Sequence, residues 1–188
     1  MVQAIIIHGT CSEEEYFDVS SPALCHKHWI PWLHKQLLIK GIHTQTPQMP
    51  LAYKPDYSQW KEMFEKVLDE DTKILVGHSC GGGFLTRWLS ENHRSFDTVI
   101  LIAPWLDPDR VKTTDFFEFQ IDNKLSQRIK NLKLFISTDD DSDIIKSFNI
   151  ITSEIADIDV VTFTDKGHFT EKTMKSTKFP ELLSAIIN

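Results

Sequence analysis

The chain has 188 residues and a formal net charge of −7, and 41% of its residues are hydrophobic. This length fits a single domain spanning residues 1–188, and the ordinary composition argues against disorder. The negative charge, without a stripe of Lys and Arg, argues against a nucleic-acid partner. The longest apolar runs are too short to cross a bilayer, so we expect no membrane partner either.

The N-terminus lacks the basic and apolar regions of a signal peptide, because the chain passes within a few residues into a strand-like run. The three cysteines, Cys11, Cys25 and Cys80, are odd in number and widely spaced. This pattern suits a reducing compartment better than a disulfide framework. We therefore expect a cytoplasmic protein.

Apolar, β-branched runs alternate with longer segments of helical spacing along the chain. The short runs predict strands at Ala4–Ile7, Ile42–Gln45, Lys73–Val76, Thr98–Ile102, Lys133–Ile136 and Asp159–Phe163. The longer segments predict helices over residues 26–40, 57–69, 80–91, 144–155 and 180–187. This alternation predicts an α/β protein of three layers (α/β/α), in which helices cover both faces of a mostly parallel six-stranded sheet.

One long stretch, residues 107–131, is irregular. It lies between the fourth and fifth predicted strands and contains Phe116, Phe117 and Phe119. An ordinary crossover helix with buried aromatic side chains is the simplest interpretation. The alternative is that the stretch covers part of a pocket.

Residues 77–81 read Gly-His-Ser-Cys-Gly, a G-x-S-x-G pattern between a strand-like run and a helical segment. A nucleophilic serine on such a sharp turn has a strained backbone, and side chains two residues before and after it would collide with neighbouring elements. The turn places the Ser79 hydroxyl at a helix N-terminus, which favours developing negative charge. The pattern therefore predicts Ser79 as a nucleophile. A glycine-rich turn that merely begins a helix is the alternative.

A serine nucleophile needs a base, and the base needs an orienting carboxylate. His168 follows the last predicted strand, which is the place in chain order where this base is expected. Two other histidines compete for the role. His78 adjoins Ser79 and should pack beneath the turn, whereas His8 ends the first strand and should line the substrate pocket.

The acid is expected after the fifth predicted strand, where four aspartates occur: Asp139, Asp140, Asp141 and Asp143. Spacing alone does not choose among them, and most of them could instead cap the helix that follows. A calcium loop is disfavoured because the spacing of an EF-hand is absent. His26 and His28 lie two residues apart, which is poor spacing for one helix face, so no metal is expected.

The backbone N–H groups of Thr10 and Cys80 are the expected oxyanion hole. Thr10 comes from the loop after the first strand, and Cys80 directly follows the nucleophile. The Cys80 side chain should point away from the cleft. Trp105, just beyond the fourth strand, is expected to line the substrate pocket together with His8, with a core position as the alternative.

With these residues in place, the chain resembles the small serine hydrolases typified by retinoblastoma-binding protein 9 and related bacterial proteins. The resemblance extends over nearly the whole length. The matching pieces are His8-Gly9, the turn at residues 77–81, the Ser-Thr-Asp-Asp run at 137–140 and the Gly-His-Phe run at 167–169.

This resemblance implies a catalytic triad of Ser79, Asp140 and His168. It also implies a minimal α/β-hydrolase fold with strand order 2-1-3-4-5-6 and little or no lid. The family often continues after its acid with a short apolar stretch and a proline, whereas this chain continues with Asp141-Ser142-Asp143-Ile144. Asp141 and Asp143 therefore remain alternatives for the acid.

Together these residues predict a serine hydrolase that cleaves a carboxylic ester through an acyl-enzyme, with a small acyl compound as substrate and no cofactor. One alternative is a weakly catalytic or non-catalytic protein-binding module on the same fold, whose protein partner the sequence does not identify. Another is thioesterase, amidase or acyltransferase chemistry with the same residues. These reactions differ in pocket shape, which the sequence does not show.

Overall fold

One parallel sheet forms the centre of the structure, a computed structural model that describes residues 2–113 and 115–187. Its strands are β1 (Gln3–Ile7), β2 (His43–Gln45), β3 (Thr72–His78), β4 (Phe96–Ile102), β5 (Ile129–Ser137) and β6 (Asp159–Phe163). All neighbouring strands are parallel, in the order β2-β1-β3-β4-β5-β6. The predicted fold class and strand order are confirmed.

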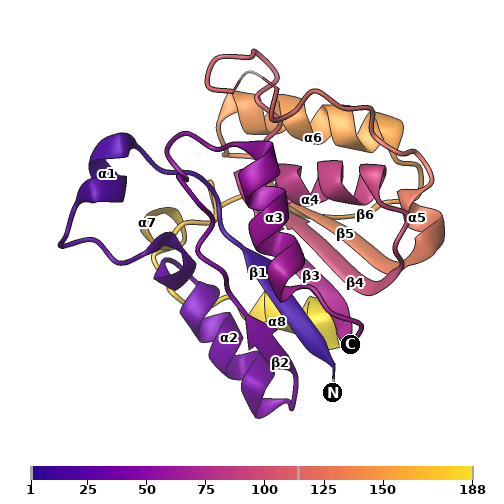
Figure 1. Cartoon of the computed structure of the whole chain (residues 1–188), viewed down its shortest axis with the longest axis horizontal. Helices are drawn as coiled ribbons and strands as arrows, with labels where there is room; N and C mark the ends of the chain where they lie inside the picture. The colour runs from indigo at the N-terminus through magenta and orange to yellow at the C-terminus, as the bar shows by residue number, and fades with distance from the viewer. Residues whose placement is uncertain (1, 114, 188) are drawn as a thin grey trace.

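The main helices cover both faces of this sheet: α2 (Ile30–Ile39), α3 (Tyr57–Val67), α4 (Cys80–Glu91), α6 (Ser142–Glu154) and α8 (Pro180–Ile187). In Figure 1, α3 lies in front of the strands and α8 behind them. Helices α3 and α4 pack through Trp60 and Phe84, whose ring centroids are 5.8 Å apart, whereas α2 contacts α8. Every residue of β1 is buried between these layers, as expected for a central parallel strand.

Helix α2 begins later than the sequence predicts. The expected helix over residues 26–40 is divided, because a short 3-10 helix, η1 (Leu24–His26), precedes it and His28 has a positive φ of 58°. Pro31 lies in the first turn of α2, where its missing N–H removes no helical hydrogen bond. Gly41 follows the C-cap residue Lys40 with a φ of 76°, a left-handed conformation that commonly ends a helix.

Three short helices were not predicted from the sequence: α1 (Glu13–Phe17), α5 (Leu125–Arg128) and α7 (Glu171–Met174). Neither α1 nor α7 buries any residue. They therefore have no apolar stripe of helical period from which they could be predicted.

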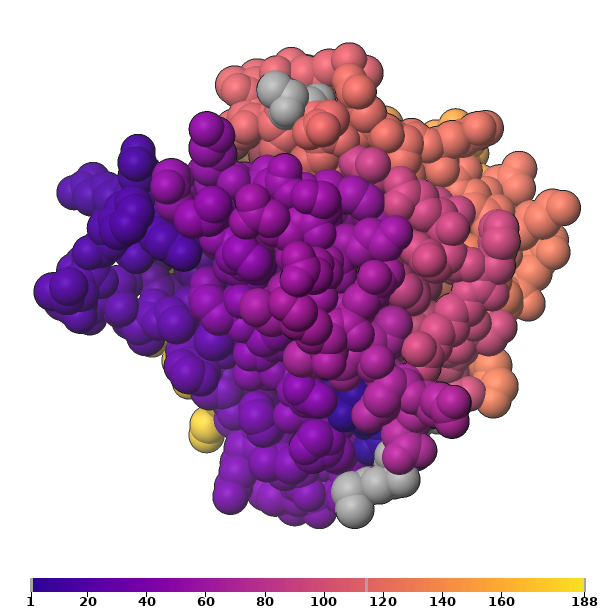
Figure 2. Space-filling model, in the orientation of Figure 1, coloured from indigo at the N-terminus to yellow at the C-terminus, as the bar shows by residue number. Residues whose placement is uncertain are grey.

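The stretch 107–131 is not a crossover helix. Within its described residues only α5 is helical, before β5 begins at Ile129. The space-filling view shows the first part of this stretch raised at the upper edge of the molecule (Figure 2). The 107–113 loop at its start is held by the Asp107 carboxylate, which accepts the backbone N–H groups of Val111, Lys112 and Thr113 at 2.6–3.0 Å. Among the residues that the structure describes, none of the helices has the length and apolar character needed to span a membrane.

Candidate active site

Ser79 occupies the sharp turn between β3 and α4. Its backbone is strained, with φ 54° and ψ −123°, a conformation that non-glycine residues adopt only when the surroundings impose it. The Ser79 N–H donates to the Ile102 carbonyl oxygen at 2.9 Å, and the Ser79 carbonyl oxygen accepts from the Trp105 N–H at 3.0 Å. Main-chain hydrogen bonds to the end of β4 and beyond therefore hold the turn.

The two glycines of the G-x-S-x-G pattern are required by close packing around this turn. A Cβ atom on Gly77 would lie 2.6 Å from the carbonyl oxygen of Gly81. A Cβ atom on Gly81 would lie 2.5 Å from the carbonyl oxygens of both Ile7 and His8. Real Cβ atoms do not approach oxygen this closely, so the steric reason inferred from the sequence applies at both positions.

Three side chains form a hydrogen-bonded row at the carboxyl end of the sheet. Ser79 Oγ lies 2.9 Å from His168 Nε2, and His168 Nδ1 lies 3.0 and 3.1 Å from the two carboxylate oxygens of Asp140. A carboxylate only accepts, so Nδ1 carries the proton and Nε2 is available to accept the Ser79 proton. The Asp140 side chain is 0% exposed and that of His168 27%. The row thus joins a buried carboxylate, through a partly exposed imidazole, to a serine that is 9% exposed.

The other three aspartates of the cluster have different partners. Asp139 accepts hydrogen bonds from the Ser137 hydroxyl and from the Gly167 N–H, and these bonds lower the pKa of Asp139. Asp143 Oδ2 accepts the indole N–H of Trp105 at 3.0 Å. Asp141 is the N-cap residue of α6.

The loop that carries His168 is fastened by side chains from other elements. The carbonyl oxygen of His168 accepts a 2.8 Å hydrogen bond from His78 Nε2. The next carbonyl oxygen, of Phe169, accepts a 3.0 Å bond from the Trp29 indole. Burial lowers the pKa of His78 well below its ordinary value, so its ring is neutral. His78 therefore packs beneath the turn, as expected from the sequence.

His8 does not line the cleft, contrary to expectation. Its ring is 2% exposed, with Nδ1 2.7 Å from the Gly9 carbonyl oxygen and Nε2 accepting the Met49 N–H at 2.8 Å. Burial lowers the pKa of His8 to about 4. The His8 ring packs edge to face against Trp60 of α3, with centroids 5.9 Å apart, so His8 joins the β1 end to the loop before α3 instead of reaching a substrate.

Thr10 and Cys80 lie beside Ser79, where backbone donors were expected. Neither backbone N–H has an acceptor among the described residues. A Cβ atom on Gly9 would approach the Ser79 Cβ to 2.9 Å, so a glycine there lets the Thr10 loop pass close to the serine. The Cys80 thiol is fully buried, and burial raises its pKa well above the ordinary value, which leaves it unreactive.

Ser79 and His168 open into a cleft of about 530 Å³. Trp105 and Thr10 both line this cleft, although Trp105 is only 4% exposed and also belongs to the core. The 107–113 loop adds two further lining residues, Lys112 and Thr113, so the start of the stretch 107–131 covers part of a pocket, which was the alternative expected from the sequence. No periodic pattern marks these two residues in the sequence. Among residues 2–113 and 115–187, no group of three or more His, Cys, Asp or Glu side chains is arranged to hold a metal ion.

Two sequence comparisons show what this chain is similar to. The profile of the family described as "Serine hydrolase" matches residues 21–185. YdeN of Bacillus subtilis (strain 168), which is named as a hydrolase, is 26% identical over 176 residues, or 90% of this chain and 86% of YdeN.

Solved structures share the fold. The ydeN gene product from B. subtilis has a TM-score of 0.80 at 24% identity, over 99% of this chain and 97% of that chain. Est1E from Butyrivibrio proteoclasticus gives 0.63 at 14% identity, over 100% and 89% of the two chains. The methylesterase MES16 from Arabidopsis gives 0.65 at 14%, over 99% of each chain. At these identities the similarity shows a common α/β-hydrolase fold.

Proposed function

Because the chain belongs to the serine hydrolase family, we propose that it hydrolyses carboxylic esters, with Ser79 as the nucleophile. The observation that carries this proposal is the hydrogen-bonded row from Asp140 through His168 to Ser79 on a strained turn. Such a row supplies the three roles that acyl transfer by a serine requires: nucleophile, base and orienting acid.

In the proposed mechanism, Ser79 Oγ attacks the ester carbonyl carbon while His168 Nε2 accepts the hydroxyl proton. Asp140 holds the Nδ1 proton in place and stabilises the imidazolium that forms. The N–H groups of Thr10 and Cys80 receive the carbonyl oxygen as it gains charge, and one such donor contributes about 10²–10³ in turnover. His168 then protonates the leaving alcohol, and water, deprotonated by His168, releases the acid from Ser79.

The finer expectations from the sequence belong to the same proposal. They are a single-domain hydrolase of the retinoblastoma-binding protein 9 type with little lid, a small acyl substrate, and action in the cytoplasm. Trp105 is proposed as a substrate contact because it lines the cleft beside Ser79.

A fluorophosphonate probe tests the nucleophile directly, because it labels activated serines. We expect one label on the intact protein, at Ser79, and none on Ser79→Ala. Ser12 also lines the cleft, so Ser12→Ala is the matched control and should label like the wild type. Equal labelling of Ser79→Ala, or an unlabelled wild type, would refute the proposed function. If matched thioesters or amides were turned over faster than esters, the proposed substrate class would be wrong, and the protein would instead be a thioesterase or an amidase.

A further inference from the structure

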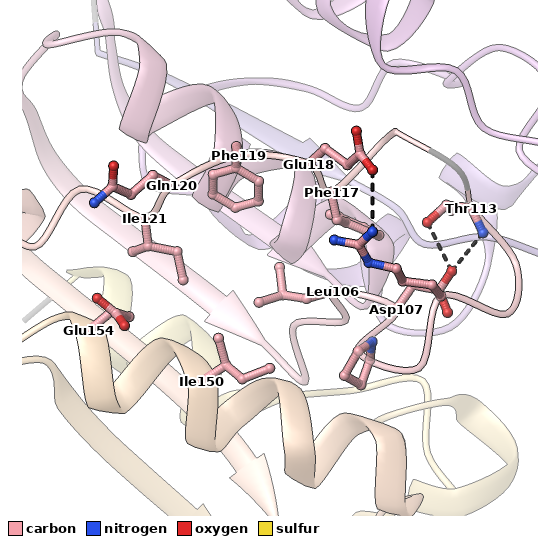
Figure 3. Close-up of a pocket in the computed structure, with 12 residues that line it drawn as sticks. Leu106, Asp107, Thr113, Phe117, Glu118, Phe119, Gln120, Ile121, Ile150 and Glu154 are labelled. Carbon is pink, nitrogen blue, oxygen red and sulfur yellow. Dashed lines mark hydrogen bonds and ion pairs between the residues drawn. The ribbon is translucent and has the colours of Figure 1, made fainter.

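A second cavity lies next to the cleft, between the segment 106–121 and helix α6. Its volume is about 380 Å³. Figure 3 shows Leu106, Phe117 and Ile121 directed into it from the segment, and Ile150 directed into it from α6. This size is within the range of small-molecule sites in proteins.

Apolar side chains line this cavity together with charged ones: Leu106, Phe117, Phe119, Ile121 and Ile150 beside Asp107, Arg110, Glu118 and Glu154. Ile150 remains 40% exposed although it sits on a packed helix, so apolar surface faces water there. Arg110 Nη1 and Glu118 Oε1 form an ion pair at 3.4 Å on this lining. An apolar group that displaced water from these walls would gain free energy in proportion to the area it covers.

The cavity adjoins the Ser79 cleft through consecutive and shared residues. Trp105 lines the cleft and Leu106 lines the cavity, while Thr113 lines both. The Trp105 and Phe117 rings meet edge to face with centroids 5.5 Å apart, and so form the partition between the two spaces. The cleft itself carries charged groups, including Lys112. Ile144 is an aliphatic side chain in the lining of the cleft, whereas Leu106, Ile121 and Ile150 line the cavity beside it.

We infer that this cavity binds the unbranched hydrocarbon chain of an ester whose carbonyl carbon is attacked by Ser79. The inference rests on the proposed function and names its substrate class: esters with a medium-length alkyl chain, which passes Thr113 to lie between Phe117 and Ile150. The charged side chains of the lining limit how far the chain can extend.

Chain-length kinetics test this assignment. Two series of esters are compared, one lengthened in the acyl chain and the other in the alcohol. In at least one of these series, kcat/KM should rise about three- to fourfold with each added methylene until the cavity is full. Ile150→Glu places a carboxylate in the cavity. It should lower the ratio of kcat/KM for a long-chain ester to kcat/KM for a short acetate ester at least tenfold. Asn149→Glu, an exposed neighbour on α6 outside the cavity, is the matched control and should keep the wild-type ratio.

Methyl NMR of the Ser79→Ala protein with octyl acetate separates this inference from the proposed function. We expect the Ile121 and Ile150 methyl signals to shift on titration, and the Ile121 shift to be lost when Ile150→Glu is added. If the wild type hydrolyses esters but neither the methyl signals nor the Ile150→Glu ratio changes, the cavity assignment is wrong and the hydrolase stands. If the methyl signals shift in a protein that hydrolyses no ester, the chain site stands and the hydrolase fails.

Discussion

The Nε2–H of His78 donates a 2.8 Å hydrogen bond to the main-chain carbonyl oxygen of His168. The residue before the proposed nucleophile thereby holds the loop that carries the proposed base. The two rings lie with centroids 5.1 Å apart. Because burial lowers the pKa of His78 well below its ordinary value, the ring stays neutral near pH 7. The donor function at Nε2 is then fixed by the carbonyl oxygen that it faces.

Removing this donor should misplace the base. We expect His78→Phe to lower kcat for ester hydrolysis about 10–100-fold with little change in KM, since a shift of about 1 Å in a catalytic group can cost 10²-fold. His78→Gln, whose amide can donate, should recover part of the loss. Urea unfolding monitors the stability of both variants, and the kinetics are measured where they are fully folded. Equal kcat in the wild type and both variants would contradict a positioning role for His78.

Substitution of the four clustered aspartates should separate one acid from three structural residues. Asp140→Asn should lower kcat by about 10⁴, because an amide in place of the carboxylate stabilises the wrong His168 tautomer. Asp139→Asn should lose less activity and act mainly through the loop that Asp139 holds at Gly167. Asp141→Asn, at the N-cap of α6, should stay within a few-fold of the wild type.

The fourth substitution in this set is Asp143→Asn. Its contact is with the Trp105 indole, so it should alter the dependence on substrate structure more than kcat for a small ester. The measurement is steady-state kinetics on all four variants under one set of conditions. A loss at Asp141 or Asp143 as deep as that at Asp140 would contradict the assignment of the acid.

Much of the fold follows from hydrophobic period and turn chemistry, which act locally. The strands, the helix starts at Tyr57, Cys80 and Pro180, and the turn at Ser79 were all predicted in this way. The choice of acid could not be derived from spacing, because neighbouring aspartates differ only in how the chain turns after β5. The resemblance to a known family, by contrast, indicated the aspartate that contacts His168.

The remaining features depend on contacts between residues far apart in the sequence. The guanidinium of Arg87 on α4 donates to the carbonyl oxygens of Asp115 and Phe116, and this helps to fix a stretch that has no period of its own. The inward direction of His8 likewise depends on its contact with Met49, 41 residues away. Such contacts leave no signal in a single sequence, which is why the crossover helix expected in the stretch 107–131 and the expected position of the His8 ring were wrong.

The folded state should become less stable at acidic pH because of His8. Burial lowers its pKa from 6.5 to about 4 in the folded state. Above pH 6.5 both states hold a neutral ring and His8 adds no pH dependence. Between about pH 6.5 and 4 the unfolded chain binds a proton that the folded chain does not, so the free energy of unfolding decreases as the pH falls, by about 3 kcal/mol in total.

Two measurements check this pH dependence. The imidazole signals of His8 in NMR should show no protonation down to about pH 5. In urea unfolding, the stability difference between the wild type and His8→Gln should narrow as the pH is lowered from 7 to 5, because only the wild type loses the His8 contribution. A constant difference, or a His8 ring that protonates near pH 6.5, would contradict the expected shift.

Asp107 should hold the 107–113 loop in the position in which it lines both the Ser79 cleft and the second cavity. Burial tends to raise its pKa, but the N–H groups of Thr113, Lys112 and Val111 outweigh that effect and lower it. Asp107→Ala would leave these donors without the carboxylate, and hydrogen bonds to a charged group contribute about 1.5–3 kcal/mol each when buried and less where water can replace them. We therefore expect local opening more than global unfolding.

Limited trypsin digestion measures this opening, because Arg110 and Lys112 are cleavage sites within the loop. Asp107→Ala should be cut there at least tenfold faster than the wild type, while its urea midpoint changes little. Asp109→Ala is the matched control, since Asp109 pairs on the surface with Lys146 and accepts none of the three loop N–H groups. Equal cleavage of Asp107→Ala and the wild type would show that the carboxylate does not hold the loop. Faster cleavage of Asp107→Ala alone would identify it as the residue that fixes Lys112 and Thr113 in the cleft.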